Sequence, residues 1–316
     1  MIKRVLAIVV LLCALAGWLV AQDAKPSAPP AAPQPPSGSQ TIRVRVELVN
    51  VLMTVTDRKN RLVIHMTKDD FNVFEDSKPQ TIRYFSRESD LPLRIAILID
   101  TSNSIRDRLR FEQEAAIDFL NTTIRRGKDM AFVVGFDVEP QLIQDYTDNT
   151  EKLANAIRDL QAGGVTSLYD ALFFSCKEKM LFFPPPEPYL RRVMIVISDG
   201  QDNQSEHTRE EALAMAQRAE VTIFTISTNR SGTEARGDKV LRRLAEETGG
   251  RAFFPFEASE LAVNFQEIAR ELRSQYSLAY VSTNSAHDGT FRNISIQPLE
   301  KSLRVRAKTG YFAPSQ

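Results

Sequence analysis

The sequence has almost no cysteine, because its 316 residues include only Cys13 and Cys176. Cys13 lies in an N-terminal apolar segment that we expect to be removed, which leaves Cys176 as a lone thiol. A lone thiol excludes an internal disulfide framework. Cys176 stands in the apolar stretch YDALFFSCKEKM without a basic partner pattern, so we expect a small buried core residue and not a nucleophile.

Histidine is also scarce, and its three residues, His65, His207 and His287, are far apart in the sequence. Their separation does not match the ligand spacing of a zinc site. A glycine-rich phosphate loop ending in lysine is absent, and so is the Gly-x-Ser-x-Gly pattern of serine hydrolases. These absences argue against phosphate-loop nucleotide binding and against serine hydrolysis.

The chain has no excess of charge of one sign, since 40 Lys and Arg residues balance 40 Asp and Glu residues. We therefore expect neither nucleic acid nor an acidic membrane surface as its main partner. Apolar residues make up 43% and charged residues 25% of the chain, which is typical of globular proteins. The length suffices for one large domain or two modest ones.

The longest apolar run covers residues 5–20 and follows two basic residues. A basic start, an apolar stretch and a small residue at Ala21 predict a secretory signal peptide over residues 1–21. Cleavage after Ala16 and retention as an uncleaved membrane anchor are the alternatives. The prediction implies an exported protein that is periplasmic, secreted or part of the cell envelope.

The two ends of the remaining chain have β character. Residues 22–40, rich in proline, alanine and serine, are expected to form an extended linker. Residues 41–90 alternate apolar and polar side chains, with a phase shift in LVNVLMTVTD that predicts a bulge or a bend, and with a turn at residues 76–79 between two strands. Residues 276–316 contain a strand and then two strands around a turn near residues 298–301. We expect both ends to build one small β-sandwich-like domain.

Between these ends, residues 91–275 alternate apolar strands with helices. This pattern predicts an α/β fold, with a doubly wound, mostly parallel sheet that helices cover on both faces. Residues 141–146 are expected to pair antiparallel at one edge. Strands are predicted at 93–99, 130–136, 193–198, 221–226 and 252–254, and helices at 106–125, 151–160, 168–181, 209–219, 238–247 and 259–273.

Oxygen-bearing side chains gather where three of these segments reach the same edge of the sheet. Asp100, Ser102 and Ser104 follow the first parallel strand in DTSNS. Thr166 stands in the glycine-rich loop GGVTSLYDAL, and Asp199 follows another buried strand in VISDG. Hydroxyl and carboxylate oxygens suit Mg²⁺, Mn²⁺ or Ca²⁺ better than zinc. The sequence therefore predicts a divalent-metal site beyond the carboxyl ends of the strands.

These five residues resemble the metal-ion-dependent adhesion site of von Willebrand factor type A domains, whose motif is Asp-x-Ser-x-Ser, a distant Thr and a distant Asp. The flanks LVNVLMTVTDRKNRLVIHMTKDDFNVFEDSKPQTIRYFS and VRAKTGYFAP are similar to the VWFA-related Acidobacterial domain family. The resemblance implies that the serines and often the threonine contact the metal, while the aspartates act largely through water. The family loop reads Gly-Gly-Thr, whereas Val165 intervenes here, so Thr166 is assigned and Ser167 is the runner-up.

The resemblance implies a non-enzymatic protein that adheres to a protein or surface partner, whose Asp or Glu carboxylate completes the metal shell. One alternative is a passive structural module of the cell envelope with a vestigial metal site. The other is a metal-dependent hydrolase, which would need a general base that no matching loop supplies.

Several residues near the predicted site receive simpler interpretations from the sequence. Asp202 and Asn203 are interpreted as solvated loop residues, and Asp137 as a turn residue. Asp170 is interpreted as a first-turn helix carboxylate that the helix dipole favours. The aromatic run around Phe173 is interpreted as part of the core.

Overall fold

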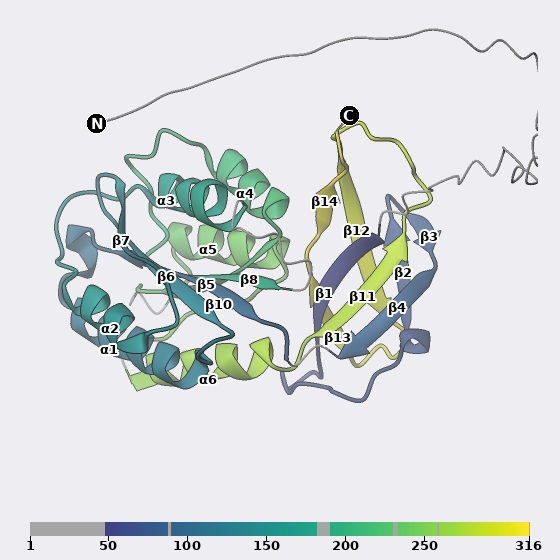
Figure 1. Ribbon diagram of the computed structural model, residues 1–316, viewed down its shortest axis with the longest axis horizontal. Coiled ribbons are helices and arrows are strands. Elements are labelled where there is room, and N and C mark those ends of the chain that lie inside the picture. The colour runs from purple at the N-terminus through teal and green to yellow at the C-terminus, as the bar shows by residue number, and fades with distance from the viewer. Residues whose placement is uncertain (1–47, 88–89, 182–189, 230–232, 258, 316) are drawn as a thin grey trace, which may run out of the picture. The chain divides into compact units, whose positions relative to one another are not determined.

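The computed structural model describes residues 48–87, 90–181, 190–229, 233–257 and 259–315. The predicted signal peptide and linker lie outside these residues. The middle of the chain forms a six-stranded sheet in the order β10-β9-β8-β5-β6-β7 (Figure 1). Its strands are β5 (Leu93–Asp100), β6 (Met130–Phe136), β7 (Pro140–Thr147), β8 (Arg191–Ser198), β9 (Val221–Ser227) and β10 (Ala252–Phe253).

Pairing in this sheet is parallel throughout, except that β7 pairs antiparallel with β6 at the edge. The predicted parallel sheet and its antiparallel edge strand are therefore confirmed. All eight residues of β5 are buried, because the strand lies in the middle of the sheet with helices over both faces. The carboxyl ends of β5, β8 and β9 consequently meet at one edge.

Within the described residues, the helices α1 to α6 cover both faces of the sheet (Figure 1). Side chains on one face of β5, such as Ile95 and Ile97, join one buried cluster, and those on the other face, such as Leu98, join a second. The first cluster includes side chains of α1 (Leu109–Thr123), α2 (Thr150–Arg158) and α6 (Ser259–Leu272). The second includes side chains of α3 (Leu168–Phe174), α4 (Arg209–Arg218) and α5 (Arg236–Glu247).

All six helices differ from their predicted spans, and two of them differ by three residues or more at one end. The helix predicted to start at Arg106 begins at Leu109, because Asn103–Ile105 form a 3₁₀ turn directly after β5. The helix predicted for residues 168–181 is α-helical only as far as Phe174, and Ser175–Met180 continue it as a π-helix. The 3₁₀ turn lies where the oxygen-bearing residues of DTSNS stand, so these residues precede the regular helix.

Both ends of the described chain contribute to two further antiparallel sheets. One has the order β13-β1-β11-β4, and the other β14-β12-β2-β3. A buried apolar cluster includes side chains from both sheets, among them Met53, Val73, Tyr280 and Ile294, which confirms the predicted β-sandwich-like part. The strands are β1 (Leu48–Thr56), β2 (Phe71–Glu75), β3 (Lys78–Gln80), β4 (Ile82–Arg87), β11 (Tyr276–Val281), β12 (Phe291–Pro298), β13 (Arg304–Ala307) and β14 (Gly310–Phe312).

The bulge predicted within LVNVLMTVTD is absent from β1, which pairs in unbroken register with β11 and β13. The apolar alternation ends there for another reason. Thr54 is fully buried, and its hydroxyl donates a hydrogen bond of 2.9 Å to Glu271 at the end of α6. Thr54 therefore faces Glu271 in the interior of the same chain, and not solvent.

Two strands predicted as continuous are each divided in two. After the turn at Asp76 and Ser77, β3 pairs with β2, whereas β4 pairs with β11 in the other sheet. Near the C-terminus, β13 pairs with β1, whereas β14 pairs with β12. Each division marks the point where the chain passes from one sheet to the other, which depends on partners that are distant in the sequence.

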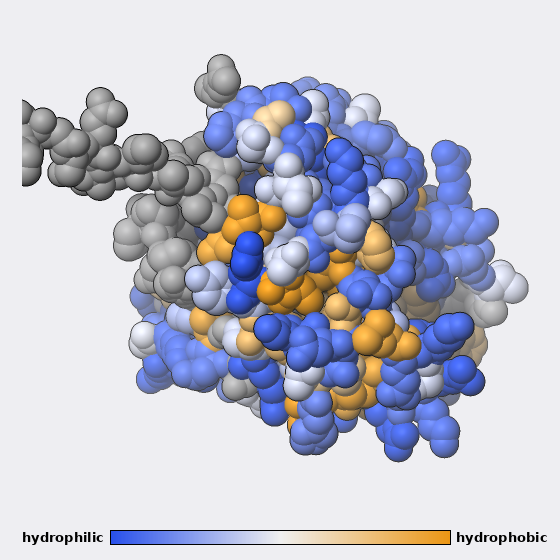
Figure 2. Space-filling view, turned by 90° about the vertical axis from the view of Figure 1, so that its right-hand side faces the viewer, coloured by the Kyte–Doolittle hydropathy of each residue, from blue (hydrophilic) through white to orange (hydrophobic). Residues whose placement is uncertain are grey.

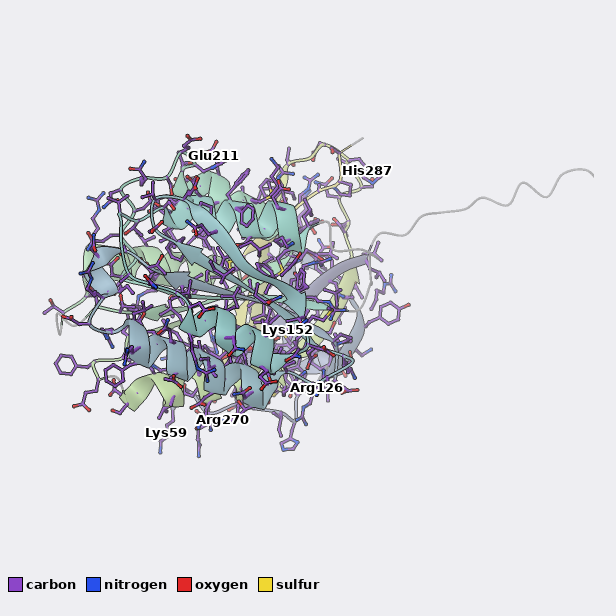
Figure 3. The ribbon with its side chains drawn as sticks, turned by 60° about the vertical axis from the view of Figure 1, so that its left-hand side comes forward. Lys59, Arg126, Lys152, Glu211, Arg270 and His287 are labelled. Atoms are coloured by element: carbon purple, nitrogen blue, oxygen red, sulfur yellow. The ribbon has the colours of Figure 1, made fainter. Side chains whose placement is uncertain are left out.

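On the face toward the right of Figure 1, hydrophilic side chains interrupt the apolar patches (Figure 2). Glu211 on α4 and Arg270 on α6 lie on the outer sides of opposite helical layers (Figure 3). None of the helices in the described parts of the chain is long and apolar enough to cross a membrane.

Candidate metal site

Asp100, the last residue of β5, has a fully buried side chain. Its Oδ1 accepts a hydrogen bond of 2.9 Å from the backbone N–H of Ser102, and its Oδ2 accepts one of 2.7 Å from the hydroxyl of Ser198. Burial raises the pKa of Asp100 to about 6; the bonds from Ser102 and Ser198 oppose this rise, and the charge of Asp199 adds to it. A cation at this edge would favour the ionised form of Asp100.

The hydroxyl oxygens of Ser102 and Ser104 are 2.9 Å apart. Ser102 is buried, whereas Ser104 is exposed at the rim. In an octahedral Mg²⁺ shell with metal–oxygen distances of about 2.0–2.1 Å, neighbouring ligand oxygens are about 2.9 Å apart. The spacing of the two hydroxyls therefore fits two adjacent ligands of one cation, and it also suits the hydrogen bond that they form.

The Thr166 loop is held against the DTSNS segment by backbone contacts. The N–H of Gly163 donates to the carbonyl of Thr101 at 2.6 Å, and the side-chain amide of Asn103 donates to the carbonyl of Gly164 at 3.1 Å. Gly164 has a φ of +71°, and a Cβ there would lie 3.1 Å from the Cβ of Asp137. Glycine is therefore favoured at this position, both by the backbone conformation and by the close packing.

Two hydroxyls in this loop are candidates for the metal. The N–H of Thr166 donates to the side-chain oxygen of Asn203, and the N–H of Asn203 donates to the carbonyl of Thr166, each at 3.1 Å. These two hydrogen bonds hold the loop in place. The Thr166 and Ser167 side chains are both buried. Neither hydroxyl forms a hydrogen bond with another residue that the structure describes, and the oxygen of Ser167 is buried without a partner there. Both therefore remain available as ligands.

Asp199 follows β8 in a turn that depends on glycine. Its Oδ1 accepts a bond of 2.9 Å from the N–H of Gln201. Gly200 has a φ of +75°, and a Cβ there would lie 2.3 Å from the carbonyl oxygen of Gly237 in the first turn of α5. The turn therefore packs directly on backbone, which leaves little freedom for the position of Asp199.

Three residues near the site have roles that sequence reasoning missed. Ser198 orders the Asp100 carboxylate, and Asn203 holds the Thr166 loop. Asp202, interpreted as solvated, accepts bonds from the N–H of Tyr169 at 3.0 Å and the hydroxyl of Ser205 at 2.6 Å. The signal was the segment SDGQDNQSEH, because Ser, Asp and Asn often bond to nearby backbone groups.

The arrangement brings together segments from three distant parts of the sequence. Together they provide two carboxylates and up to four hydroxyls, a hard oxygen set of the kind that Mg²⁺, Mn²⁺ or Ca²⁺ prefers. Within the described residues, no group of three or more His, Cys, Asp or Glu side chains could hold a metal ion. Hydroxyl ligands would therefore have to supply part of any metal shell.

Comparison with solved structures finds several chains of similar organisation. The mussel byssus proximal thread matrix protein 1 with a zinc-occupied MIDAS motif is 18% identical, with a TM-score of 0.48, over 62% of this chain and 48% of that one. The vWF domain of the type V pili tip protein Mfa5 from Porphyromonas gingivalis is 16% identical, with a TM-score of 0.47, over 57% of this chain and 94% of that one.

Comparisons of sequence add a curated relative and a family model. The von Willebrand factor A domain-containing protein 3B of Homo sapiens is 29% identical over 167 residues, which is 51% of this chain but only 12% of that protein. The model of the von Willebrand factor type A domain matches residues 95–271, more than half of the chain. The chain therefore belongs to the von Willebrand factor type A domain family.

Proposed function

We propose that this protein is an exported, non-enzymatic adhesion module that binds its partner through a divalent cation. Asp100, Ser102, Ser104, Thr166 and Asp199 would hold the cation, with Mg²⁺ as the first choice and Mn²⁺ or Ca²⁺ as alternatives. When bound, the cation supplies an electrophilic position that a partner's Asp or Glu carboxylate can fill. Ser167 remains the alternative to Thr166.

The observation that carries the proposal is the environment of Asp100. Burial is the main cause that raises the pKa of Asp100, and the charge of Asp199, which stands at the neighbouring strand end, adds to it. Holding two carboxylates together at a dry edge is costly unless a cation offsets their repulsion. The adjacent hydroxyl pair of Ser102 and Ser104, 2.9 Å apart, offers ligands at the spacing that such a cation needs.

The hydrolase alternative has less support from this edge. Asp100 and Asp199 both accept hydrogen bonds from neighbouring groups of the protein. His207, bonded to Asp170 at 2.7 Å, lines a pocket that none of the five candidate ligands lines. A hydrolase would need a general base placed against metal-bound water, and this imidazole belongs to a separate pocket. The proposal therefore assigns binding, and not turnover, to the cation.

The division of the chain belongs to the same proposal. Residues 1–21 would be the signal peptide and residues 22–40 a linker to the envelope or beyond it. Residues 91–275 would form the type A domain, and residues 41–90 and 276–316 would complete the β-sandwich-like domain. The passive structural module with a vestigial metal site remains the runner-up. The intact set of five oxygen-bearing residues favours a metal site that still binds a cation.

Calorimetric titration with Mg²⁺ and Mn²⁺ tests the cation directly. The wild type should bind one equivalent, whereas Asp100→Asn and Ser104→Ala should bind weakly or not at all. Asp107→Asn, an exposed aspartate close in sequence, is the matched control and should bind as the wild type does. Equal heats from the wild type and the site variants would refute the metal assignment.

Capture from an envelope fraction tests adhesion. Full-length protein should retain a partner in Mg²⁺, release it in EDTA, and lose it in Thr166→Ala. A partner that stays bound in EDTA would show that the metal edge is not the contact. Turnover of ester, phosphodiester or peptide substrates that disappears in Asp100→Asn would favour the hydrolase instead.

A further inference from the structure

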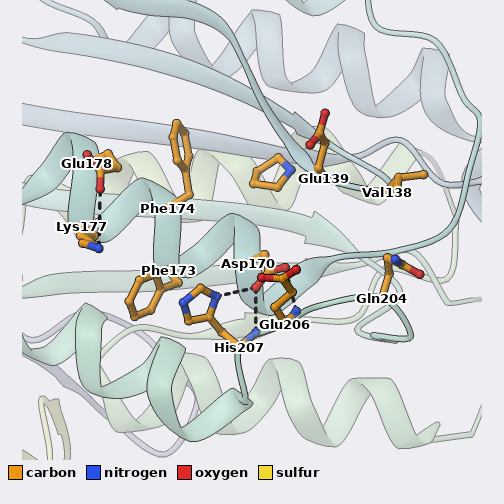
Figure 4. A pocket seen from close by; sticks show the side chains of 11 residues that line it. Val138, Glu139, Asp170, Phe173, Phe174, Lys177, Glu178, Gln204, Glu206 and His207 are labelled. Atoms are coloured by element: carbon orange, nitrogen blue, oxygen red, sulfur yellow. Dashed lines mark hydrogen bonds and ion pairs between the residues drawn. The ribbon is translucent and has the colours of Figure 1, made fainter.

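A pocket of about 530 Å³ opens between the β6–β7 turn and α3 (Figure 4). One wall is the β6–β7 turn, Val138–Pro140, and the other is the segment Gln204–His207. Asp170, Phe173 and Phe174 on α3, and Lys177 and Glu178 on the π-helix after it, complete the lining. None of the five residues assigned to the cation lines this pocket, so it is a separate site on the same side of the sheet.

Contacts with the Thr166 loop and with the start of α3 hold the two walls in place. The β6–β7 wall follows Asp137, against whose side chain Gly164 packs. The other wall is bonded to the start of α3, because the N–H of Asp170 donates to the hydroxyl of Ser205 at 3.0 Å. The carboxylate of Asp170 in turn accepts bonds of 2.9 Å from the N–H groups of Glu206 and His207. A group bound here would therefore lie close to the metal edge.

The charge of the lining is mainly negative. Asp170 is already satisfied, since its carboxylate also contacts the His207 ring at 2.7 Å. Burial opposes its ionisation, but the hydrogen bonds from the N–H groups of His207 and Glu206 outweigh burial and lower the pKa of Asp170. Lys177 lies 4.0 Å from Glu178 at the far end. Glu139 and Glu206 form no ion pair with any residue in the described ranges, and both are exposed.

An aromatic surface lies beside these carboxylates. The rings of Phe173 and His207 are stacked, with centroids 3.8 Å apart and an interplanar angle of 21°. The Nζ of Lys177 lies 5.5 Å from the centre of the Phe173 ring, so the outer part of this surface already attracts one cation of the chain itself. Phe174 also lines the pocket. Flat apolar faces next to unpaired carboxylates suit a planar cation, which can stack and donate hydrogen bonds together.

We propose that this pocket binds an arginine side chain of a protein partner. The guanidinium group would lie against the aromatic surface and donate hydrogen bonds to Glu139 and Glu206, the two lining carboxylates that form no ion pair within the described ranges. Lysine would fit less well, because its ammonium group neither stacks nor reaches two carboxylates in one plane. The identity of this partner with the one whose carboxylate binds the cation rests on the proposed function. The preference of the pocket for arginine is independent of the proposed function.

Nuclear magnetic resonance titration of the labelled full-length protein with Nα-acetyl-arginine amide tests the pocket in EDTA, without any metal. The amide signals of Gln204, Glu206, His207 and Phe173 should shift and saturate. Concentrations up to about 200 mM are used, because two exposed ion pairs and one cation–π contact of about 1 kcal/mol each imply a dissociation constant of about 10 mM or weaker. Nα-acetyl-glutamine amide, which has a similar chain without the charge, should cause no saturating shift.

Variants link the binding to the carboxylates. Glu139→Gln and Glu206→Gln should each weaken arginine binding by about two- to fivefold, as expected for an exposed ion pair. Glu246→Gln, on the exposed side of α5, is the matched control and should leave it unchanged. Absence of a saturating shift, an equal response to the glutamine compound, or unchanged binding in both pocket variants would overturn the proposal.

The two proposals fail separately. If arginine amide binds in EDTA but calorimetry detects no cation, the pocket stands and the metal assignment falls. If Mg²⁺ binds to the wild type but arginine amide does not shift the pocket signals, the pocket proposal alone is wrong.

Discussion

The hydroxyl of Ser198 donates a hydrogen bond of 2.7 Å to the buried carboxylate of Asp100, and thereby joins β8 to β5 at the edge where both strands end. The same oxygen accepts a bond of 3.0 Å from the N–H of Gly200. A single serine thus links Asp100 to the turn that carries Asp199. This contact positions both carboxylates, although Ser198 is not assigned to the cation.

Ser198→Ala should therefore weaken the site without removing a ligand. Loss of a bond to a charged, buried group should lower the free energy of unfolding by about 1–3 kcal/mol. Metal affinity should fall by about 10- to 100-fold, as is typical when a group that orients a ligand is removed. Calorimetry and denaturant unfolding measure the two effects, and Ser295→Ala, an exposed serine on β12, is the control. Unchanged metal affinity in Ser198→Ala would contradict the positioning role.

Gly200→Ala should distort the turn that carries Asp199. The residue has a φ of +75°, and an added Cβ would lie 2.3 Å from the backbone oxygen of Gly237. The strained backbone alone should cost about 1–3 kcal/mol of unfolding free energy. Gly163→Ala is the matched control, because a Cβ at Gly163 meets nothing within 4 Å. Metal titration and thermal unfolding should show a clear loss for Gly200→Ala only; similar behaviour of the two variants would contradict this account.

Tyr280→Phe should loosen the contact between the two β-rich sheets. Glu75 on β2 is buried and accepts bonds from the hydroxyls of Tyr280 at 2.8 Å and Tyr311 at 3.0 Å. Burial, followed by the bond to Glu75, raises the pKa of Tyr280, which therefore acts as a donor throughout the physiological range. Removing the hydroxyl leaves one bond fewer to a buried carboxylate and should cost about 1–3 kcal/mol.

Amide hydrogen exchange tests the same contact locally. Protection should fall together in β2 and β11, although one precedes the type A domain in the sequence and the other follows it. Tyr84→Phe is the control, because Tyr84 is 64% exposed and should change stability by less than about 0.5 kcal/mol. Reduced protection in β11 with unchanged protection in β2 would argue against one shared β-domain.

Asp129 should make the fold sensitive to acid. Burial alone would raise the pKa of its carboxyl group, but bonds from Arg125, the N–H of Leu93 and Arg273 outweigh burial and lower it from 3.8 to about 2. The unfolded chain therefore binds a proton at higher pH than the folded protein does. The stabilisation, about 2 kcal/mol, should be complete above about pH 4 and disappear as the pH falls toward 2.

Denaturant unfolding between pH 2 and pH 6 measures this dependence. Asp129→Asn should reduce stability at pH 6 and flatten the acid limb of the curve. Asp118→Asn, an exposed aspartate on α1, should keep the wild-type profile. An acid limb in Asp129→Asn as steep as in the wild type would place the acid-sensitive group elsewhere.

Much of the type A domain could be predicted from local sequence. Continuous apolar runs such as residues 93–99 and 193–198 predicted strands that are buried on both faces, and the intervening amphipathic stretches predicted helices. Element ends shifted by a few residues, as at Leu109, where a 3₁₀ turn intervenes. The five candidate metal residues could be named because each stands at a strand end or loop, and such ends meet at one edge of any parallel sheet.

The tertiary structure alone decided the features that depend on partners distant in sequence. The division between β3 and β4 follows from pairing with different sheets, and the need for glycine at Gly200 follows from contact with Gly237. Asn203 has its role only because its loop meets Thr166. Local sequence sets which conformation each segment prefers, whereas these contacts depend on which segments the folded chain brings together.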